Sequence, residues 1–186
     1  MDYRDYKTSR DLAWEILLRE EVRELPVMVG NLCRKMGIKV NYYIPTDDND
    51  GKSTVIGGEP RILVSSLCSK ERQRFTAAHE LGHILLGHAR ELVIANREPS
   101  SNDSPVEHAA NVFASRLLAP ACVLWALNAR TAEEIAALCQ ISLQSAQFRA
   151  KRMELLYERG KFLASPLERK VYEQFLPYIM ERKEGL

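Results

Sequence analysis

The feature that most constrains this chain is the pentapeptide His79-Glu80-Leu81-Gly82-His83, which fits the pattern H-E-x-x-H. It falls within residues 70–86, whose pattern predicts one long helix that is opened by Ser69 and closed by Gly87. Histidines four residues apart lie on one face of a helix, one turn from each other, so both imidazoles can reach a single metal ion. Glu80 can act on water at that metal without being a ligand itself.

The alternative is a surface helix with two half-exposed histidines and a solvated glutamate. Gly82 argues against this alternative, because a glycine inside an exposed helix costs about 1 kcal/mol relative to alanine. A glycine here is easier to explain where another backbone comes close. A chance match is also improbable, since the pattern needs two histidines and all four histidines of the chain lie between residues 79 and 108.

A catalytic zinc site normally has three protein ligands and one position left for water. The candidates for the third ligand all follow the motif: His88, Asp103, Glu107 and His108. Glu107 is on a second predicted helix, where Asn111 follows one turn later and can hydrogen-bond a ligating histidine. However, Ser104-x-x-Glu107 is also a capping-box pattern, in which Glu107 would only cap its own helix. Spacing alone leaves both roles open.

The pattern of the remaining chain predicts an α+β protein with a helical C-terminal part. We expect a first helix over roughly residues 10–23, capped by Ser9, and a second from Pro26 to about Met36. A strand over 38–44 and a hairpin formed by 54–56 and 61–64 follow. After the motif we expect a loop over 90–103 and a helix over 105–118. After residue 122 only helices are predicted. We therefore divide the chain into a domain over residues 1–122 and a helical tail over residues 123–186.

Residues 131–152 of this tail loosely resemble a helix-turn-helix, although Gln140 replaces the usual turn glycine. The alternative is a small helical core with a solvated charged face. The core would be formed by Ile135, Leu138, Ile141, Ala146 and Phe148. We favour the helical core over DNA binding. A third use is favoured over either of these, namely holding a protein substrate beside the metal site.

Composition narrows the function classes further. The formal net charge of +1 does not suit a partner such as nucleic acid or an acidic membrane, so direct DNA binding is not expected. The longest apolar stretches are judged shorter than the roughly 18–20 residues that span a bilayer. The polar N-terminus has no apolar signal region, and the four cysteines contain no C-x-x-C pair. These features predict a cytoplasmic protein with reduced thiols and no membrane partner.

Three segments of the sequence closely resemble the ImmA/IrrE family of metallopeptidases: Arg74–His83, Ile84–His88 and Glu107–Pro120. In that family, the H-E-x-x-H helix is followed by a helix with the pattern Glu-x-x-Ala-Asn-x-Phe-Ala, whose glutamate is the third zinc ligand. The resemblance implies a zincin-like catalytic domain with a small antiparallel sheet and a thermolysin-like ligand set, and it assigns the third ligand to Glu107. Family members often carry a second acidic residue where this chain has Ala109.

The expected function is therefore that of a gluzincin-like zinc metalloendopeptidase, with Zn²⁺ on His79, His83 and Glu107 and with Glu80 as the general base. The resemblance implies that the substrate is a helix-turn-helix transcriptional repressor of a mobile element or stress regulon. Two alternatives remain open: a non-catalytic zinc-containing regulatory or protein-binding module, and a DNA-binding regulator that acts through the tail. An oxyanion donor is expected among His88, His108 and the tyrosines, and the sequence does not choose between them.

Overall fold

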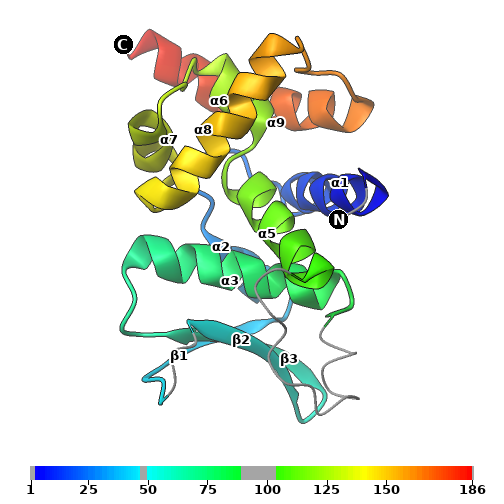
Figure 1. Cartoon of the computed structure of the whole chain (residues 1–186), viewed down its shortest axis with the longest axis vertical. Helices are drawn as coiled ribbons and strands as arrows, with labels where there is room; N and C mark the ends of the chain where they lie inside the picture. Colours follow the sequence, from blue (N-terminus) through cyan, green and yellow to red (C-terminus); the bar gives the residue numbers. More distant parts are fainter. Residues whose placement is uncertain (1–2, 47–49, 89–103, 186) are drawn as a thin grey trace. The chain divides into compact units, whose positions relative to one another are not determined.

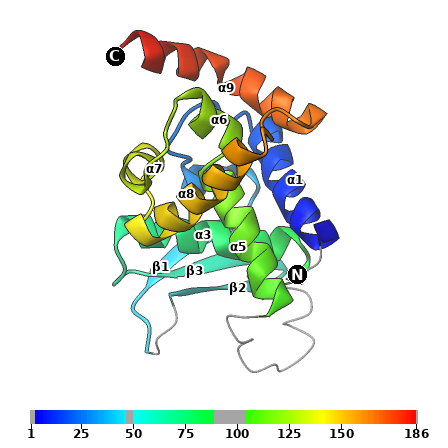
Figure 2. The same cartoon turned by 45° about the horizontal axis from the view of Figure 1, so that its top comes forward.

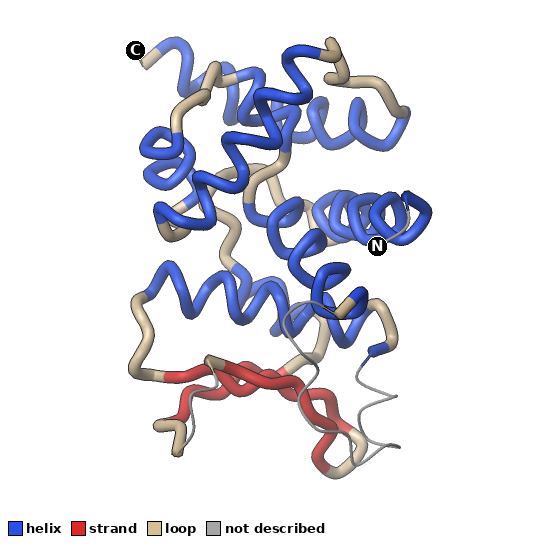
Figure 3. The backbone as a smooth tube through the Cα atoms, in the orientation of Figure 1, coloured by secondary structure: helices blue, strands red, loops and turns tan. Residues whose placement is uncertain are grey.

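A computed structural model describes the chain over residues 3–46, 50–88 and 104–185. Its elements, in chain order, are α1 (Tyr3–Arg19), α2 (Val29–Lys35), β1 (Lys39–Tyr43), β2 (Gly51–Ile56), β3 (Glu59–Ser65), α3 (Lys70–Leu85), α5 (Pro105–Leu118), α6 (Ala121–Ala126), α7 (Ala132–Cys139), α8 (Leu143–Glu158) and α9 (Pro166–Glu184) (Figure 1). The described strands gather in one small sheet, as Figure 3 shows, and the α+β prediction is confirmed. The loop predicted over residues 90–103 lies outside the described residues.

The sheet has the strand order β1-β3-β2 and is mixed. The predicted hairpin is present, because β2 pairs antiparallel with β3 across Gly57 and Gly58, whose φ angles are 60° and 80°. β1 instead pairs parallel with β3, from Lys39 opposite Arg61 to Tyr43 opposite Ser65. The sheet is therefore not wholly antiparallel as expected. A hairpin pattern fixes only the relation between two consecutive strands, whereas the position of β1 depends on long-range packing.

Helix α3 packs on β2 and β3, and α2 packs on both α3 and β1 (Figures 1 and 2). Ser69 caps α3 as predicted, because its Oγ accepts a hydrogen bond from the backbone N–H of Arg72. Gly87, with a φ of 82°, follows the end of the helix. Ile62 and Val64 of the central strand and Leu81 of α3 are fully buried. This packing gives α3, which carries the histidine motif, a rigid base.

The chain divides into two compact units, one formed by residues 1–10 and 28–114 and the other by residues 11–27 and 115–186. The second unit therefore contains part of α1 in addition to the C-terminal helices. Within this unit, the side-chain amide of Gln174 on α9 donates to the backbone oxygens of Leu17 and Val22, each at 2.8 Å. Our division of functions between residues 1–122 and 123–186 stays a prediction.

The N-terminal helices differ from the prediction in their bounds. α1 begins at Tyr3, so Ser9 lies inside the helix and is not its cap. The Ser9 hydroxyl donates to the backbone oxygen of Asp5 at 3.1 Å, a bond that a serine within a helix can form in place of capping. α2 begins only at Val29, three residues after Pro26. Both differences concern helix ends, which the apolar pattern defines poorly.

The tail contains the predicted pair of helices, α7 and α8. Thr131 and Glu134 form a complete capping box at the start of α7. Gln140 adopts the left-handed conformation between the helices, with φ 49° and ψ 51°, which is the conformation that the turn glycine of a helix-turn-helix usually supplies. Phe148 is 69% exposed, so its assignment to the core was wrong. The neighbouring position, Arg149, is buried instead, and its Nε donates to the Ala119 oxygen at 2.8 Å.

One stretch among the described residues, Pro105–Ala126, has the length and apolar composition of a membrane-spanning helix. This stretch was not predicted from the sequence, because Pro120 separates the two helices that compose it. In the most apolar window, 83% of the residues are buried inside the protein, as in the core helix of a soluble domain. The stretch is therefore weak evidence for a membrane span.

Candidate metal centre

His79, His83 and Glu107 come together between α3 and the first turn of α5. Their ligand atoms all lie within 4.8 Å of one another, and no other group of this kind occurs in the part of the chain that the structure describes. The two Nε2 atoms are 2.9 Å apart. The Glu107 carboxylate lies 3.1 Å from Nε2 of His79 and 3.5 Å from Nε2 of His83. Two helices therefore aim two nitrogens and one carboxylate at one point.

The distances between these donors suit one small metal ion. Zinc binds histidine nitrogen and carboxylate oxygen at about 2.0–2.2 Å in a tetrahedral arrangement, so any two of its ligand atoms are separated by about 3.3–3.5 Å. The three separations of 2.9, 3.1 and 3.5 Å lie close to this value. The donor set of two imidazoles and one carboxylate is also one that zinc proteases use. The residues present thus fit the metal that the sequence implies.

Both histidines have a partner behind the ring. His79 Nδ1 lies 2.9 Å from the side-chain oxygen of Asn111, which can only accept a hydrogen bond. The proton of a neutral His79 is therefore on Nδ1, and Nε2 presents its lone pair to the cluster. His83 Nδ1 lies 3.2 Å from Nδ1 of His88. Asn111 thus occupies the orienting position expected from the sequence, and His88 supports a ligand from behind.

Electrostatics within the cluster act on His79 in two directions. Burial lowers the pKa of its imidazole, but the hydrogen bond to Glu107, the charges of Glu80 and Glu107 and the contact with Asn111 together raise it above the ordinary value. A bound cation would replace the proton in this environment, since both are stabilised by the same two carboxylates. The site is therefore built for positive charge.

Glu80 lies beside the cluster and not within it. Its side chain is buried, and its charge acts on His79, but its carboxylate does not belong to the group of three ligand atoms. Gly51 of β2 adjoins this side chain, because an added Cβ at Gly51 would come 3.8 Å from Cγ of Glu80 and would collide with Cγ2 of Thr76. Glu80 is thus enclosed between α3 and the start of β2, where a carboxylate can act as a base without ligating.

Gly82 is explained by a close approach, although not by the backbone contact that we expected. An added Cβ would lie 2.9 Å from Cδ1 of Phe113 and 3.3 Å from its Cβ and Cγ. Phe113 is on α5 and is fully buried. The missing side chain therefore lets the Phe113 ring pack directly on the H-E-x-x-H helix. This contact sets the spacing at which Glu107, on the same helix as Phe113, reaches the histidines.

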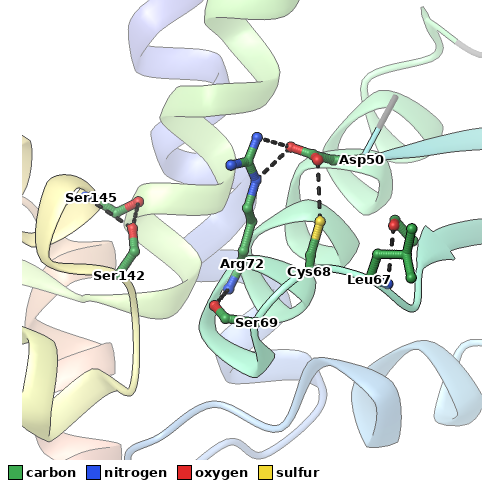
Figure 4. A network of polar contacts seen from close by, with 8 residues as sticks. Asp50, Leu67, Cys68, Ser69, Arg72, Ser142 and Ser145 are labelled. Atoms are coloured by element: carbon green, nitrogen blue, oxygen red, sulfur yellow. Dashed lines mark hydrogen bonds and ion pairs between the residues drawn. The ribbon is translucent and has the colours of Figure 1, made fainter. Parts of the chain in front are cut away.

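A polar network, shown in Figure 4, joins the start of β2 to the N-terminus of α3. Asp50 accepts a hydrogen bond from Nε of Arg72 at 2.6 Å and forms an ion pair with the same guanidinium. The Cys68 thiol donates to the other oxygen of Asp50 at 3.2 Å. Burial and this contact with Asp50 raise the pKa of Cys68. This network was not predicted from the sequence, because it joins positions in a polar loop to a helix start.

The four candidates for the third ligand differ in where the chain places them. Ser104 Oγ accepts a hydrogen bond from the backbone N–H of Glu107 at 3.2 Å, so this residue is part of the helix cap through its backbone while its carboxylate faces the histidines. His108 is exposed on α5 and His88 contacts His83 from behind. Asp103 lies outside the described residues. The structure therefore brings Glu107 to the histidines, and the ligand and base roles stay predictions.

Comparison with known proteins assigns this fold and site to a family. The family model for Peptidase M78, described as the IrrE N-terminal-like domain, matches residues 33–151, and the chain belongs to this family. The solved structure of a Mycobacterium tuberculosis transcriptional regulator is similar in fold, with a TM-score of 0.53 and 17% sequence identity. That likeness covers 75% of this chain and 45% of the regulator. No curated protein matches the chain.

Proposed function

We propose that this protein is a zinc-dependent endopeptidase that uses His79, His83 and Glu107 to hold the metal and Glu80 as general base. The observation that carries the proposal is the convergence of the three donor atoms, with a buried carboxylate beside them that is not one of the three. A purely structural metal site has no use for this fourth group. Membership of the metallopeptidase family supports the same function.

The mechanism assigns one task to each side chain. Zinc, when bound, acts as a Lewis acid that activates water and polarises the scissile carbonyl. The Glu80 carboxylate accepts the proton of the attacking water and then passes it to the nitrogen of the departing amine. Asn111 holds His79 in the tautomer with a free Nε2, and His88 lies behind His83. The buried position of Glu80 keeps bulk water away from its proton transfers.

The proposed substrate is a helix-turn-helix transcriptional repressor of a mobile element or stress regulon. This class is the one that the family resemblance implies, and the reaction would be cleavage at a specific site in the cytoplasm. None of the four cysteines, all of which lie within the described residues, forms a disulfide, which is compatible with a reducing compartment. The helices α7 and α8 are proposed to contribute to recognition of this protein substrate. Helix α8 of the second unit carries both basic and acidic side chains: Lys151, Arg152, Glu154 and Glu158. Recognition of a protein surface with charges of both signs therefore suits this unit better than DNA binding.

The direct test is co-expression of the protein with a helix-turn-helix repressor of the proposed class, in the wild-type form and as Glu80→Gln. We expect the wild type to shorten the repressor, and the variant to leave it intact, since glutamine keeps the shape of the side chain but cannot accept the proton. Glu71→Gln is the matched control, because it makes the same change on the same helix at a position outside the cluster. Equal cleavage by wild type and Glu80→Gln would refute the mechanism.

A further inference from the structure

Exposed apolar side chains gather near β1, which is an edge strand of the sheet. Tyr42 in this strand is 60% exposed, and Ile44, directly after it, is 74% exposed. Met28, which precedes α2, is 54% exposed. Single exposed apolar residues need no explanation, but several on neighbouring segments are typical of a surface that binds another molecule.

Two of these residues line a pocket of about 190 Å³ between α2, α3 and β1. Met28 and Tyr42 supply apolar walls, together with Val29, Val40 and Ala77. The volume is smaller than the roughly 300–1,000 Å³ of sites that enclose cofactors or drug-sized ligands. The pocket therefore suits one or two side chains of a polypeptide better than a whole small molecule.

The polar lining of this pocket is cationic. Lys70 and Arg74 lie one turn apart on α3 and both contribute to the wall, whereas no acidic residue lines the pocket. Nζ of Lys70 contacts the uncharged Oε1 of Gln73 at 3.3 Å and lies 5.8 Å from the centre of the Tyr42 ring. Glu71, on the same helix, is close enough to Arg74 for their opposite charges to attract each other. The complementary occupant carries an apolar side chain next to a carboxylate.

The backbone of β1 offers a way to hold such an occupant. β1 pairs with β3 on one side, and no described strand pairs with its other edge. Val40 and Tyr42 are two residues apart, so they lie on the same face of β1, and both line the pocket. An extended segment added to this edge would place every second side chain on the pocket side.

We infer that the β1 edge and the Lys70–Arg74 pocket form a docking site for an extended protein segment whose pocket-facing side chains, at every second position, include both apolar and acidic residues. Residues 70, 74 and 77 lie on roughly the opposite side of α3 from residues 79 and 83. The site is therefore separate from the candidate metal centre, and it serves to hold a partner protein and not to cleave it. This inference goes beyond the proposed function and does not depend on peptide hydrolysis.

The test measures binding of two fluorescent peptides to the whole chain with Glu80→Gln, which prevents cleavage. One peptide has valine and glutamate in turn at every second position, with threonine between them, so that both face the pocket when the peptide is extended. The other has lysine in place of each glutamate. We expect the acidic peptide to bind at least about tenfold more tightly at low ionic strength, and addition of salt to reduce the difference. Hydrogen exchange of the β1 amides is expected to slow when the acidic peptide is bound.

Three variants locate the site. The double charge reversal Lys70→Glu with Arg74→Glu is expected to remove the preference for the acidic peptide, and Tyr42→Ser, which leaves the charges intact, to weaken binding of both peptides. Lys161→Glu with Lys170→Glu is the matched control, since it also reverses two exposed charges and neither residue lines the pocket. Equal binding of the two peptides, unchanged binding by Tyr42→Ser, or an equal loss in the control and in the Lys70→Glu, Arg74→Glu variant would overturn the inference. Circular dichroism of each variant verifies the fold, and Tyr42→Ser keeps the test decisive if the Lys70→Glu, Arg74→Glu variant does not fold.

Discussion

Substitution of Gly82 by alanine tests the packing on which the candidate metal centre depends. The new methyl carbon would lie 2.9 Å from Cδ1 of the Phe113 ring, which is closer than carbon atoms in proteins normally approach. Phe113 is fully buried, so the ring has no free space into which it could move. Either α5 shifts away from α3 or the ring leaves its preferred rotamer, and both changes disturb the position of Glu107.

Two opposing free-energy contributions determine how much Gly82→Ala changes the stability of the protein. Alanine in place of glycine within a helix favours folding by up to about 1 kcal/mol. Insertion of a methyl group into a well-packed core costs about 1–3 kcal/mol. The net result is a destabilisation of about 1 kcal/mol, which lowers the Tm of a chain of this size by roughly 2–4 °C. Zinc affinity is also expected to fall, because movement of α5 carries one of the three proposed ligands.

The control is Gly30→Ala in α2, where an added Cβ meets no atom within 4 Å. This variant makes the same chemical change in the same unit, and it is expected to be neutral or up to about 1 kcal/mol more stable than wild type. Thermal unfolding and zinc titration of both variants are the measurements. A Gly82→Ala protein that is as stable as Gly30→Ala and binds zinc like the wild type would refute the argument from close approach.

Three further predictions concern the ligands, their supports and the thiols. Glu107→Ala is expected to retain the fold but to lose tight zinc binding, as measured by metal content after dialysis; wild-type zinc content would show that the third ligand lies elsewhere. Asn111→Ala is expected to weaken zinc affinity by about 10–100-fold, because His79 loses the acceptor that fixes its tautomer, and unchanged affinity would contradict that role. In the native protein, Cys68 is expected to react first with iodoacetamide near neutral pH, since the other three cysteines are buried and burial raises the pKa of both Cys33 and Cys122 to about 12. Rapid labelling of Cys33 or Cys122, detected by mass spectrometry, would contradict this order.

The sequence predicted the parts of the fold that local patterns encode. The helix of the H-E-x-x-H motif, its cap at Ser69 and the hairpin across Gly57 and Gly58 all follow from residues that are close in the chain. The parallel pairing of β1 was missed, because it depends on contacts between residues about 22 positions apart, from Lys39 to Arg61 onward. Phe148 was expected in the core but is exposed, and its neighbour Arg149 is buried instead. Neighbouring positions on a helix point only 100° apart, so a small error in the expected orientation of the helix exchanges their environments.

The candidate site was predicted more completely than the fold around it. The spacing of two histidines and one glutamate on a helix limits their geometry strongly, and Asn111 could be placed by helix periodicity. The role of Glu107 could not be decided from spacing, because a capping residue and a ligand look alike in one dimension. The Asp50, Cys68 and Arg72 network was not predictable either, since a polar loop gives no signal of the helix end that it meets.

The structure also changes how the helical tail can be tested. Removal of residues from 123 onward would separate Gln174 from the backbone at Leu17 and Val22 and leave residues 11–27 without the rest of their unit. Loss of repressor cleavage in such a truncation would not distinguish recognition from misfolding. Substitution of exposed positions on α8, such as Phe148→Ser, tests recognition while keeping the unit intact. Reduced repressor cleavage with unchanged zinc content is the outcome expected if α8 contacts the substrate, and unchanged cleavage would exclude Phe148 from that contact.

The measurement that tests the central claim most directly is reconstitution of repressor cleavage with zinc. The purified wild-type protein and Glu80→Gln are stripped with a chelator, and Zn²⁺ is then titrated into each in the presence of the purified repressor. The account predicts that both proteins bind about one zinc per chain, through the three donors that converge in the structure, and that only the wild type regains cleavage as the site fills. Cleavage that persists in the stripped wild type, or that returns equally in Glu80→Gln, would contradict the assignment of a zinc peptidase with Glu80 as its base.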